Sequence, residues 1–131
     1  MRSRYAERMS NLRVWMSAAA VCGFLAVAFG AFAAHGVTDP KAKDWMHTGA
    51  IYAFLHALAV FASVVVVNAG GRLARITPPI FLSGIIIFSG TLFAMALGAP
   101  RWFGAITPIG GVLFMLGWAL LALAALQRPQ D

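Results

Sequence analysis

The chain alternates long uncharged stretches with short charged ones, and this pattern predicts four membrane-spanning helices. No Asp, Glu, Lys or Arg occurs in residues 14–38, 45–71, 76–100 or 102–127. A helix of about 20 apolar residues is about 30 Å long, which matches the hydrocarbon core of a bilayer. Backbone polar groups in lipid must bond within their own segment, so each stretch is expected to be helical.

Turn residues set the expected ends of these helices. The predicted helices cover residues 14–34, 45–68, 80–97 and 108–126. Thr107 followed by Pro108 predicts a helix start, with Thr107 as the N-cap. Asn-Ala-Gly-Gly at 68–71 predicts a helix end, and further turns are expected at 78–79 and 98–100. Short connections make sequential helices antiparallel neighbours, so the expected fold is an all-α, four-helix transmembrane bundle.

The composition supports a bilayer as the solvent of this protein. Of 131 residues, 61% are hydrophobic and only 11% are charged, against about 45–50% and about 25% in soluble domains. A chain of this length forms a single domain, here residues 1–131. The net charge of +6 is spread between the apolar stretches, so we expect membrane lipids as partners and no nucleic acid.

The distribution of Lys and Arg predicts that both termini lie inside the cell. One side of the bundle receives seven basic residues: Arg2, Arg4, Arg8, Arg13, Arg72, Arg75 and Arg128. The opposite side receives three: Lys41, Lys43 and Arg101. Short segments with the excess of positive charge stay in the cytoplasm, which predicts an N-in/C-in orientation.

Small residues recur at helical spacing and predict close packing between helices. Cys22, Ala26, Gly30 and Ala34 follow one another at intervals of four. Such stripes let helix backbones approach closely, either within one chain or between copies in an oligomer. The residues assigned to helix packing are Gly30, Gly90, Pro108, Gly110, Gly111 and Gly117.

His56 lies near the centre of the second predicted helix, and therefore near the bilayer midplane. An ionisable residue at this depth is a functional-site hypothesis. Thr48 and Tyr52 precede it at intervals of four and share its helical face, while Ser89 and Thr91 of the third helix are candidate partners. His56 is interpreted either as a proton relay, ligand contact or haem ligand, or as a neutral histidine that fixes the register between helices.

A second polar set is expected at the outer membrane interface. It comprises His35, Asp44, His47, Arg101 and Thr107. Imidazole and carboxylate ligands of this kind bind zinc or copper. The spacing matches no metal-binding signature, however, and His47 and His56 lie on roughly opposite faces of one helix. We therefore assign no metal site.

Signatures of several enzyme classes are absent from the sequence. No Asp or Glu lies in a predicted span, no glycine-rich phosphate loop precedes a Lys, and no G-x-S-x-G elbow occurs. These absences favour a protein that is not an enzyme.

Several motifs resemble those of a known family. They are GAFAAHG at 30–36, HALA at 56–59 after Tyr52, FSGTL at 88–92, and GAITPIGG at 104–111 followed by Gly117 and Trp118. The chain resembles the YgdD/YwdK-like family of small membrane proteins, a family of unknown function with eukaryotic relatives. Ala33 and Thr91 replace residues that are usually glycine and often serine in that family.

The resemblance implies a multi-pass protein of the bacterial inner membrane. It implies four transmembrane helices and no established activity. It also directs attention to His35, His56, Ser89, Thr107 and Pro108 without giving any of them a role.

Three functional hypotheses follow from the sequence. The first is a non-enzymatic accessory subunit or scaffold in a larger membrane complex, favoured by the lack of soluble domains and by the small-residue stripes. The second is a small oligomeric transporter or channel with a polar path around His56. The third is a membrane protein that binds haem or a metal through His56 or His35.

Overall fold

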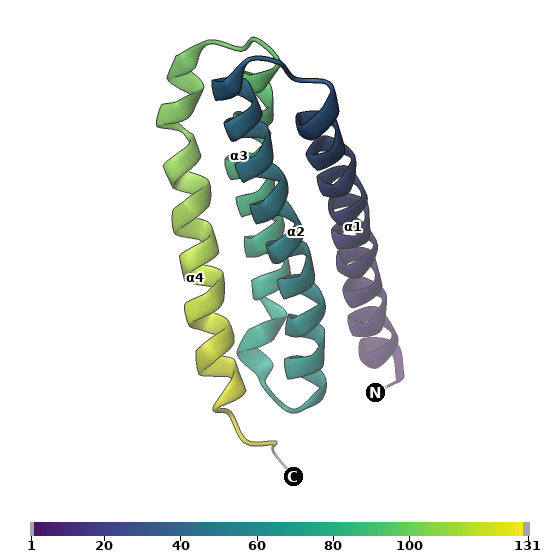
Figure 1. Ribbon diagram of the computed structural model, residues 1–131. Helices are drawn as coiled ribbons and strands as arrows, with labels where there is room; N and C mark the ends of the chain where they lie inside the picture. The colour runs from purple at the N-terminus through teal and green to yellow at the C-terminus, as the bar shows by residue number, and fades with distance from the viewer. Residues whose placement is uncertain (1, 130–131) are drawn as a thin grey trace.

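Four helices form the computed structural model of the chain (Figure 1). They are α1 (Arg2–His35), α2 (Pro40–Asn68), α3 (Thr77–Ala96) and α4 (Thr107–Ala125). Short 3-10 helices, η1 (Arg72–Arg75) and η2 (Arg101–Ala105), precede α3 and α4. Four helical segments of the described chain, the last of which joins η2 to α4, are long and apolar enough to cross a membrane. The predicted all-α, four-helix membrane fold is thereby confirmed.

The structure describes residues 2–129. Met1, Gln130 and Asp131, which belong to the single domain expected over residues 1–131, lie outside the described residues. The side chains of Arg2 and Arg8, which enter the charge count, are also outside the description.

The helices form an open arrangement rather than a closed square. α2 and α3 make up the centre, α1 packs mainly against α2, and α4 packs mainly against α3. Within the described residues α1 and α4 do not contact each other, and they flank the central pair on opposite sides (Figure 1). Both termini lie at the end of the bundle that holds η1 (Figure 1).

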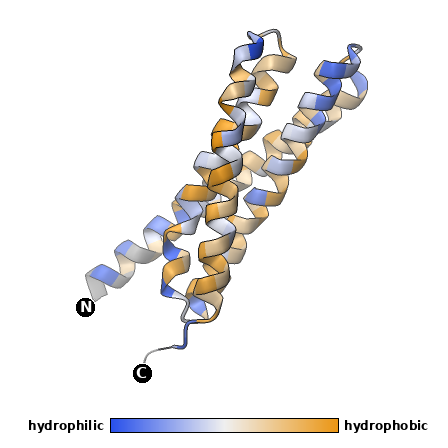
Figure 2. Ribbon diagram, turned by 90° about the vertical axis from the view of Figure 1, so that its left-hand side faces the viewer, coloured by the Kyte–Doolittle hydropathy of each residue, from blue (hydrophilic) through white to orange (hydrophobic). Residues whose placement is uncertain are grey.

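Apolar residues cover the helices along most of their length, and hydrophilic residues gather near the ends (Figure 2). The starting turns of α1 diverge from the other three helices (Figure 2). The first membrane-crossing segment of the structure begins at Met9, so the preceding charged turns extend beyond the apolar part of the bundle.

The helices begin earlier than the apolar stretches. α1 starts at Arg2 rather than at residue 14, and α2 starts at Pro40 rather than at residue 45. The Asp39 carboxylate caps α2 by accepting a hydrogen bond of 2.8 Å from the Ala42 amide. Charged residues can continue a helix into the headgroup region, where water solvates their side chains. The uncharged stretches therefore mark the part of each helix that lies in the hydrocarbon core, whereas capping residues mark the ends of the helix itself.

Two expectations about helix starts are wrong. Thr107 is the first residue of α4, and Ile106 occupies the N-cap position without a side-chain cap bond. Pro78 and Pro79 lie in the first turn of α3 instead of in the preceding turn. Proline is tolerated there because the first amides of a helix have no intrahelical partner.

Glycine ends two of the helices, as the sequence suggested. Gly70 has φ +102° after α2 and Gly98 has φ +106° after α3, a backbone conformation that side chains disfavour. The Gly71 amide donates back to the Val66 carbonyl at 2.9 Å, which satisfies a carbonyl of the last turn.

The buried face of α1 is one narrow stripe. Among its described side chains, the buried ones are Leu12, Ala19, Ala26 and Ala33, each seven positions after the one before. A seven-residue repeat keeps one seam of a helix against its neighbour. The rest of α1 is left largely to the lipid, whereas α3 buries large side chains such as Phe81, Leu82 and Ile85.

Candidate functional site

His56 is held on α2 by a hydrogen bond to its own helix. Its Nδ1 lies 2.7 Å from the carbonyl oxygen of Tyr52, one turn earlier. A carbonyl oxygen only accepts, so Nδ1 carries the hydrogen and donates it. In the neutral ring the other nitrogen, Nε2, is then a hydrogen-bond acceptor. No described residue forms a hydrogen bond with Nε2. Every fully enclosed side-chain nitrogen or oxygen of the described residues has a partner, so Nε2 is not fully enclosed.

Aromatic side chains fix the plane of the His56 ring between α2 and α4. The ring stacks on Phe114, with 3.5 Å between centroids and 8° between planes. Phe81 lies 5.9 Å away on α3, and Trp118 presents its edge at 6.2 Å. Only 5% of His56 is exposed. The imidazole is therefore oriented from three sides, and Nε2 is the polar atom left for another molecule.

A groove of about 720 Å³ opens over this ring, between α2 and α4. Its lining consists of Tyr52, His56, Phe88, Pro108, Gly111, Val112, Phe114, Met115 and Trp118. A smaller hollow of about 320 Å³ shares two of these residues and adds four from α2, namely Leu55, Leu58, Ala59 and Ala62. We call the two together the α2–α4 groove. It is an apolar, largely aromatic surface with His56 in its lining.

The other residues of the predicted midplane set point to different partners. The centroid of the Tyr52 ring lies 4.7 Å from that of Phe88, and the residue is 41% exposed. Thr48 is exposed as well. The Ser89 hydroxyl donates to the Gly49 carbonyl at 2.7 Å, which ties α3 to α2. Neither Ser89 nor Thr91 forms a hydrogen bond with His56, so the prediction that they are its partners is wrong.

Thr91 instead meets Thr107, which the sequence had suggested for the outer interface. Their hydroxyl oxygens lie 2.7 Å apart, and Thr91 also donates to the Ile87 carbonyl at 2.7 Å. The Thr107 hydroxyl can then donate to Thr91 and bridge α4 to α3. Both residues are buried.

A second buried hydroxyl pair was missed by the sequence reasoning. Thr77 donates to the Ser63 hydroxyl at 2.6 Å, and Ser63 donates to the Ala59 carbonyl at 2.8 Å. The signal was present as a repeated Ile-Thr-Pro at 76–78 and 106–108. Each copy follows a 3-10 helix and places its threonine against a hydroxyl of the preceding helix.

The predicted outer set is spread over exposed positions. His35 ends α1, Asp44 and His47 lie in the first turns of α2, and Arg101 begins η2; all four side chains are exposed. Among the described residues, no group of three or more His, Cys, Asp or Glu could hold a metal ion.

The glycines assigned to packing differ in what surrounds them. A Cβ at Gly110 would lie 2.5 Å from the Phe88 amide nitrogen, and one at Gly117 would lie 2.5 Å from the Phe81 ring. The corresponding distance at Gly30 is an ordinary 3.7 Å, and at Gly90 no atom lies within 4 Å. Gly110 and Gly117 are thus at close contacts, whereas Gly90 is not.

Two further residues from the packing set belong to the groove, and two close contacts were missed. Pro108 and Gly111 line the α2–α4 groove. Gly49 and Gly84 were not singled out, yet a Cβ there would lie 2.7 Å from Phe93 and 2.6 Å from Phe114. Gly49 is the single glycine of α2, and Gly84 is one of two glycines in α3.

Comparison with known proteins identifies relatives over most of the chain. A family model described as "Protein of unknown function (DUF423)" matches residues 29–111. A UPF0382 membrane protein of Haemophilus influenzae is 41% identical over 82% of this chain and 90% of its own. YwdK of Bacillus subtilis is 33% identical over 88% of this chain and 98% of its own.

The name of a third relative specifies the inner membrane. The UPF0382 inner membrane protein YgdD of Escherichia coli K12 is 35% identical over 83% of this chain and 86% of its own. No solved structure matches the chain. Together with the four membrane-crossing helices, these relatives indicate a multi-pass protein of the bacterial inner membrane.

Proposed function

The chain belongs to the DUF423 family, and we propose that it is a small, non-enzymatic accessory subunit that binds a transmembrane helix of a larger membrane protein. The observation that carries the proposal is the α2–α4 groove, an apolar surface with one oriented hydrogen-bond acceptor. A transmembrane helix with a Ser or Thr hydroxyl opposite His56 is the occupant we infer.

The position of the groove within the membrane favours a transmembrane helix as its occupant. Its lining runs from residue 52 to 62 on α2 and from 108 to 118 on α4. At 1.5 Å per residue, each run covers about 15 Å, roughly half of the hydrocarbon core. Since this part lies in the middle of two membrane-crossing segments, its occupant must be predominantly apolar.

The shape and chemistry of the lining favour a helix over a loosely held lipid chain. Small residues, Ala59, Ala62 and Gly111, allow close approach between large side chains such as Met115 and Trp118. Helix association in membranes depends on this kind of packing and on interhelical hydrogen bonds of about 0.6–2 kcal/mol. Nε2 of His56 accepts such a bond without any change in the ring, because Nδ1 already donates to Tyr52.

The internal hydroxyls support binding at the surface rather than a path through the chain. Ser63, Ser89 and Thr91 are buried and hydrogen-bonded to backbone or to another hydroxyl. They act as ties between helices, and their bonds are already satisfied. The N-in/C-in orientation remains part of the proposal; it is supported by the basic residues at the end that holds both termini.

Site-specific photo-crosslinking in native membranes tests the proposal. A photoreactive amino acid replaces Val112 in the groove, and in the control it replaces Val65 on α2, outside the groove and equally accessible (63% and 67% exposed). We expect a discrete protein adduct from position 112 only, with the crosslinked peptide in a transmembrane segment of the partner.

Two further variants test whether the groove itself is responsible. Gly111→Leu fills the groove and should abolish the adduct, whereas Gly90→Leu, in open space on α3, should leave it. Adducts to lipid alone, or equal adducts from both positions, would refute the accessory-subunit role. An adduct of two copies of this chain would replace it with self-association.

A further inference from the structure

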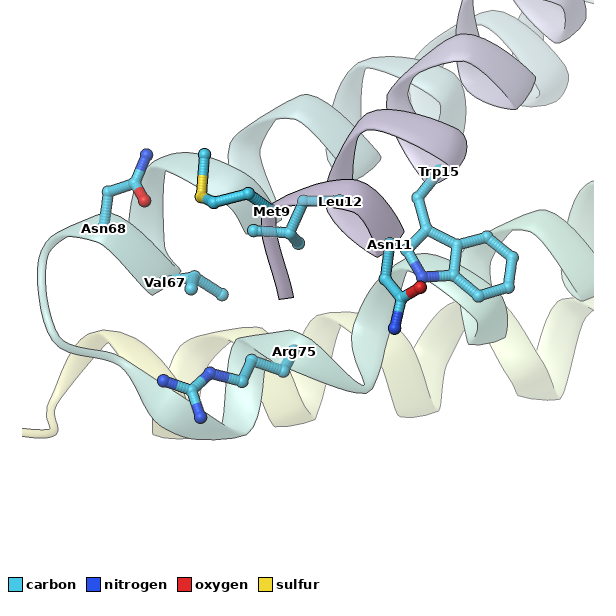
Figure 3. A pocket seen from close by; sticks show the side chains of 7 residues that line it. All are labelled: Met9, Asn11, Leu12, Trp15, Val67, Asn68 and Arg75. Carbon is cyan, nitrogen blue, oxygen red and sulfur yellow. The ribbon is translucent and has the colours of Figure 1, made fainter. Parts of the chain in front are cut away.

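A pocket of about 390 Å³ lies between the N-terminal part of α1 and the junction of α2 with η1 (Figure 3). The first membrane-crossing segment begins at Met9, and the second ends at Asn68. Both residues line the pocket. The pocket therefore lies where the hydrocarbon core gives way to lipid headgroups.

Hydrogen-bond donors without partners line this pocket. They are the Arg75 guanidinium, the Trp15 indole N–H and the side-chain amides of Asn11 and Asn68. No described residue hydrogen-bonds any of these side chains, and no described carboxylate forms an ion pair with Arg75. Figure 3 shows Asn11 and Trp15 at one end, Asn68 at the other, and Arg75 along the side between them.

The only side-chain oxygens in this lining are the two amide carbonyls. Guanidinium and N–H donors without a neighbouring carboxylate suit an acceptor-rich anion, and arginine in particular matches the oxygens of a phosphate. A free cation or a hydroxyl-rich sugar would find few acceptors here.

The remaining wall is apolar. Met9, Leu12 and Val67 complete the lining, and the Trp15 ring has the amphipathic character of residues that sit at the headgroup level. A ligand with a phosphate beside a glycerol and acyl chains would bond the donors through its phosphate and pack against the apolar residues through its acyl chains. An inorganic phosphate would satisfy only the polar one.

The charge of this end of the molecule favours an anionic lipid. Arg4, Arg13, Arg72 and Arg128 are exposed there together with Arg75, and Glu7 is the described acid among them. Such a basic end attracts anionic lipids at the membrane surface. We infer that this pocket is a specific site for the phosphodiester headgroup of an anionic glycerophospholipid. The site is separate from the α2–α4 groove, so it stands or falls independently of the proposed function.

Native mass spectrometry of the full chain in mild detergent tests the inference. The probes are phosphatidylglycerol and phosphatidylcholine with identical acyl chains. We expect retained phosphatidylglycerol on the wild-type chain, and about a tenfold weaker retention in Arg75→Gln, the factor of one charge-assisted hydrogen bond. Arg72→Gln removes an exposed arginine of the same 3-10 helix, outside the pocket, and should keep the wild-type retention.

A thermal unfolding series provides a second readout. Phosphatidylglycerol should raise the unfolding temperature of the wild type and of Arg72→Gln equally, and that of Arg75→Gln by less, because stabilisation by a ligand falls as its affinity for the folded state falls. If Arg75→Gln does not fold, Asn11→Leu, which removes an exposed amide from the pocket, replaces it with the same expectation.

Three results would overturn the inference. Equal losses in Arg75→Gln and Arg72→Gln would reduce the effect to general charge attraction. Equal retention of phosphatidylcholine would remove the preference for an anionic headgroup. Displacement of the lipid by inorganic phosphate at an equal concentration would show that the acyl and glycerol contacts contribute nothing.

Discussion

A close approach between α3 and α4 gives a prediction whose size follows from the structure. Gly84 and Gly110 face each other there, and a Cβ at position 110 would lie 2.5 Å from the Phe88 amide nitrogen and 2.9 Å from the Gly84 carbonyl oxygen. Ordinary contact begins at 3.4 Å, so Gly110→Ala requires a local displacement of about 0.9 Å. The atoms in the way are two backbone atoms and the Cβ of Phe88, none of which a rotamer change can move.

Two opposing free-energy terms decide the outcome of Gly110→Ala. Replacing a helical glycine by alanine stabilises the helix by about 1 kcal/mol, and overpacking destabilises by about 1–3 kcal/mol. Gly90→Ala supplies the control, because it gains the same helix propensity and no atom lies within 4 Å of its new methyl group. The difference in unfolding free energy between the two variants therefore isolates the overpacking, about 1–3 kcal/mol in favour of Gly90→Ala.

Reversible unfolding in mixed micelles, followed by circular dichroism over a series of SDS concentrations, measures both variants under the same conditions. Equal stability of Gly110→Ala and Gly90→Ala would show that the two helices do not cross at Gly110 as closely as described. The displacement should also strain the Thr91–Thr107 bond, since Thr107 lies one turn before Gly110 on α4. The effects of Gly110→Ala and Thr107→Val should then be non-additive.

Three further predictions concern the ties between helices and the orientation of the chain. Thr91→Val and Thr107→Val should each lower the unfolding free energy by about 1 kcal/mol. The double variant should lose less than their sum, because both substitutions remove the shared Thr91–Thr107 bond, while Thr91→Val also removes the bond to the Ile87 carbonyl; additive losses in a double-mutant cycle would contradict this expectation. Ser89→Ala should lower the unfolding free energy by about 1 kcal/mol, because it removes the hydrogen bond to Gly49. Ser83 is exposed, so Ser83→Ala should change the unfolding free energy by no more than about 0.5 kcal/mol. Equal values for the two variants would show that the Ser89–Gly49 bond does not stabilise the packing of α3 on α2. In a Cys22→Ala background, Thr38→Cys should react with a membrane-impermeant thiol reagent added to intact cells and Ser10→Cys should not; the reverse pattern would invert the N-in/C-in orientation.

Part of the candidate site was predictable from single residues. His56 stood out because it is an ionisable side chain in the middle of an apolar span, and its depth needs only the position in the helix. Its ring plane, its stacking on Phe114 and the bond from Nδ1 to Tyr52 depend on α4 and on the rotamer. The pocket at Arg75 was not predictable, because it needs the start of α1 beside the end of α2.

The sequence by itself determined the membrane character, the helical state and the number of spans. These follow from local chemistry, because an uncharged stretch must satisfy its own backbone in lipid wherever its neighbours lie. The turns at Gly70 and Gly98 are local in the same sense, since only their backbone conformation is required.

Only the tertiary structure decided which face of each helix meets another. A helix that is apolar on all sides has no contrast between a buried and a lipid-facing side, so periodicity does not choose between Gly84 and Gly90 on α3. The choice comes from close packing between particular backbones and from hydroxyl pairs such as Ser63–Thr77. Both involve residues on different helices, and the order of residues along the chain does not show which of them come into contact.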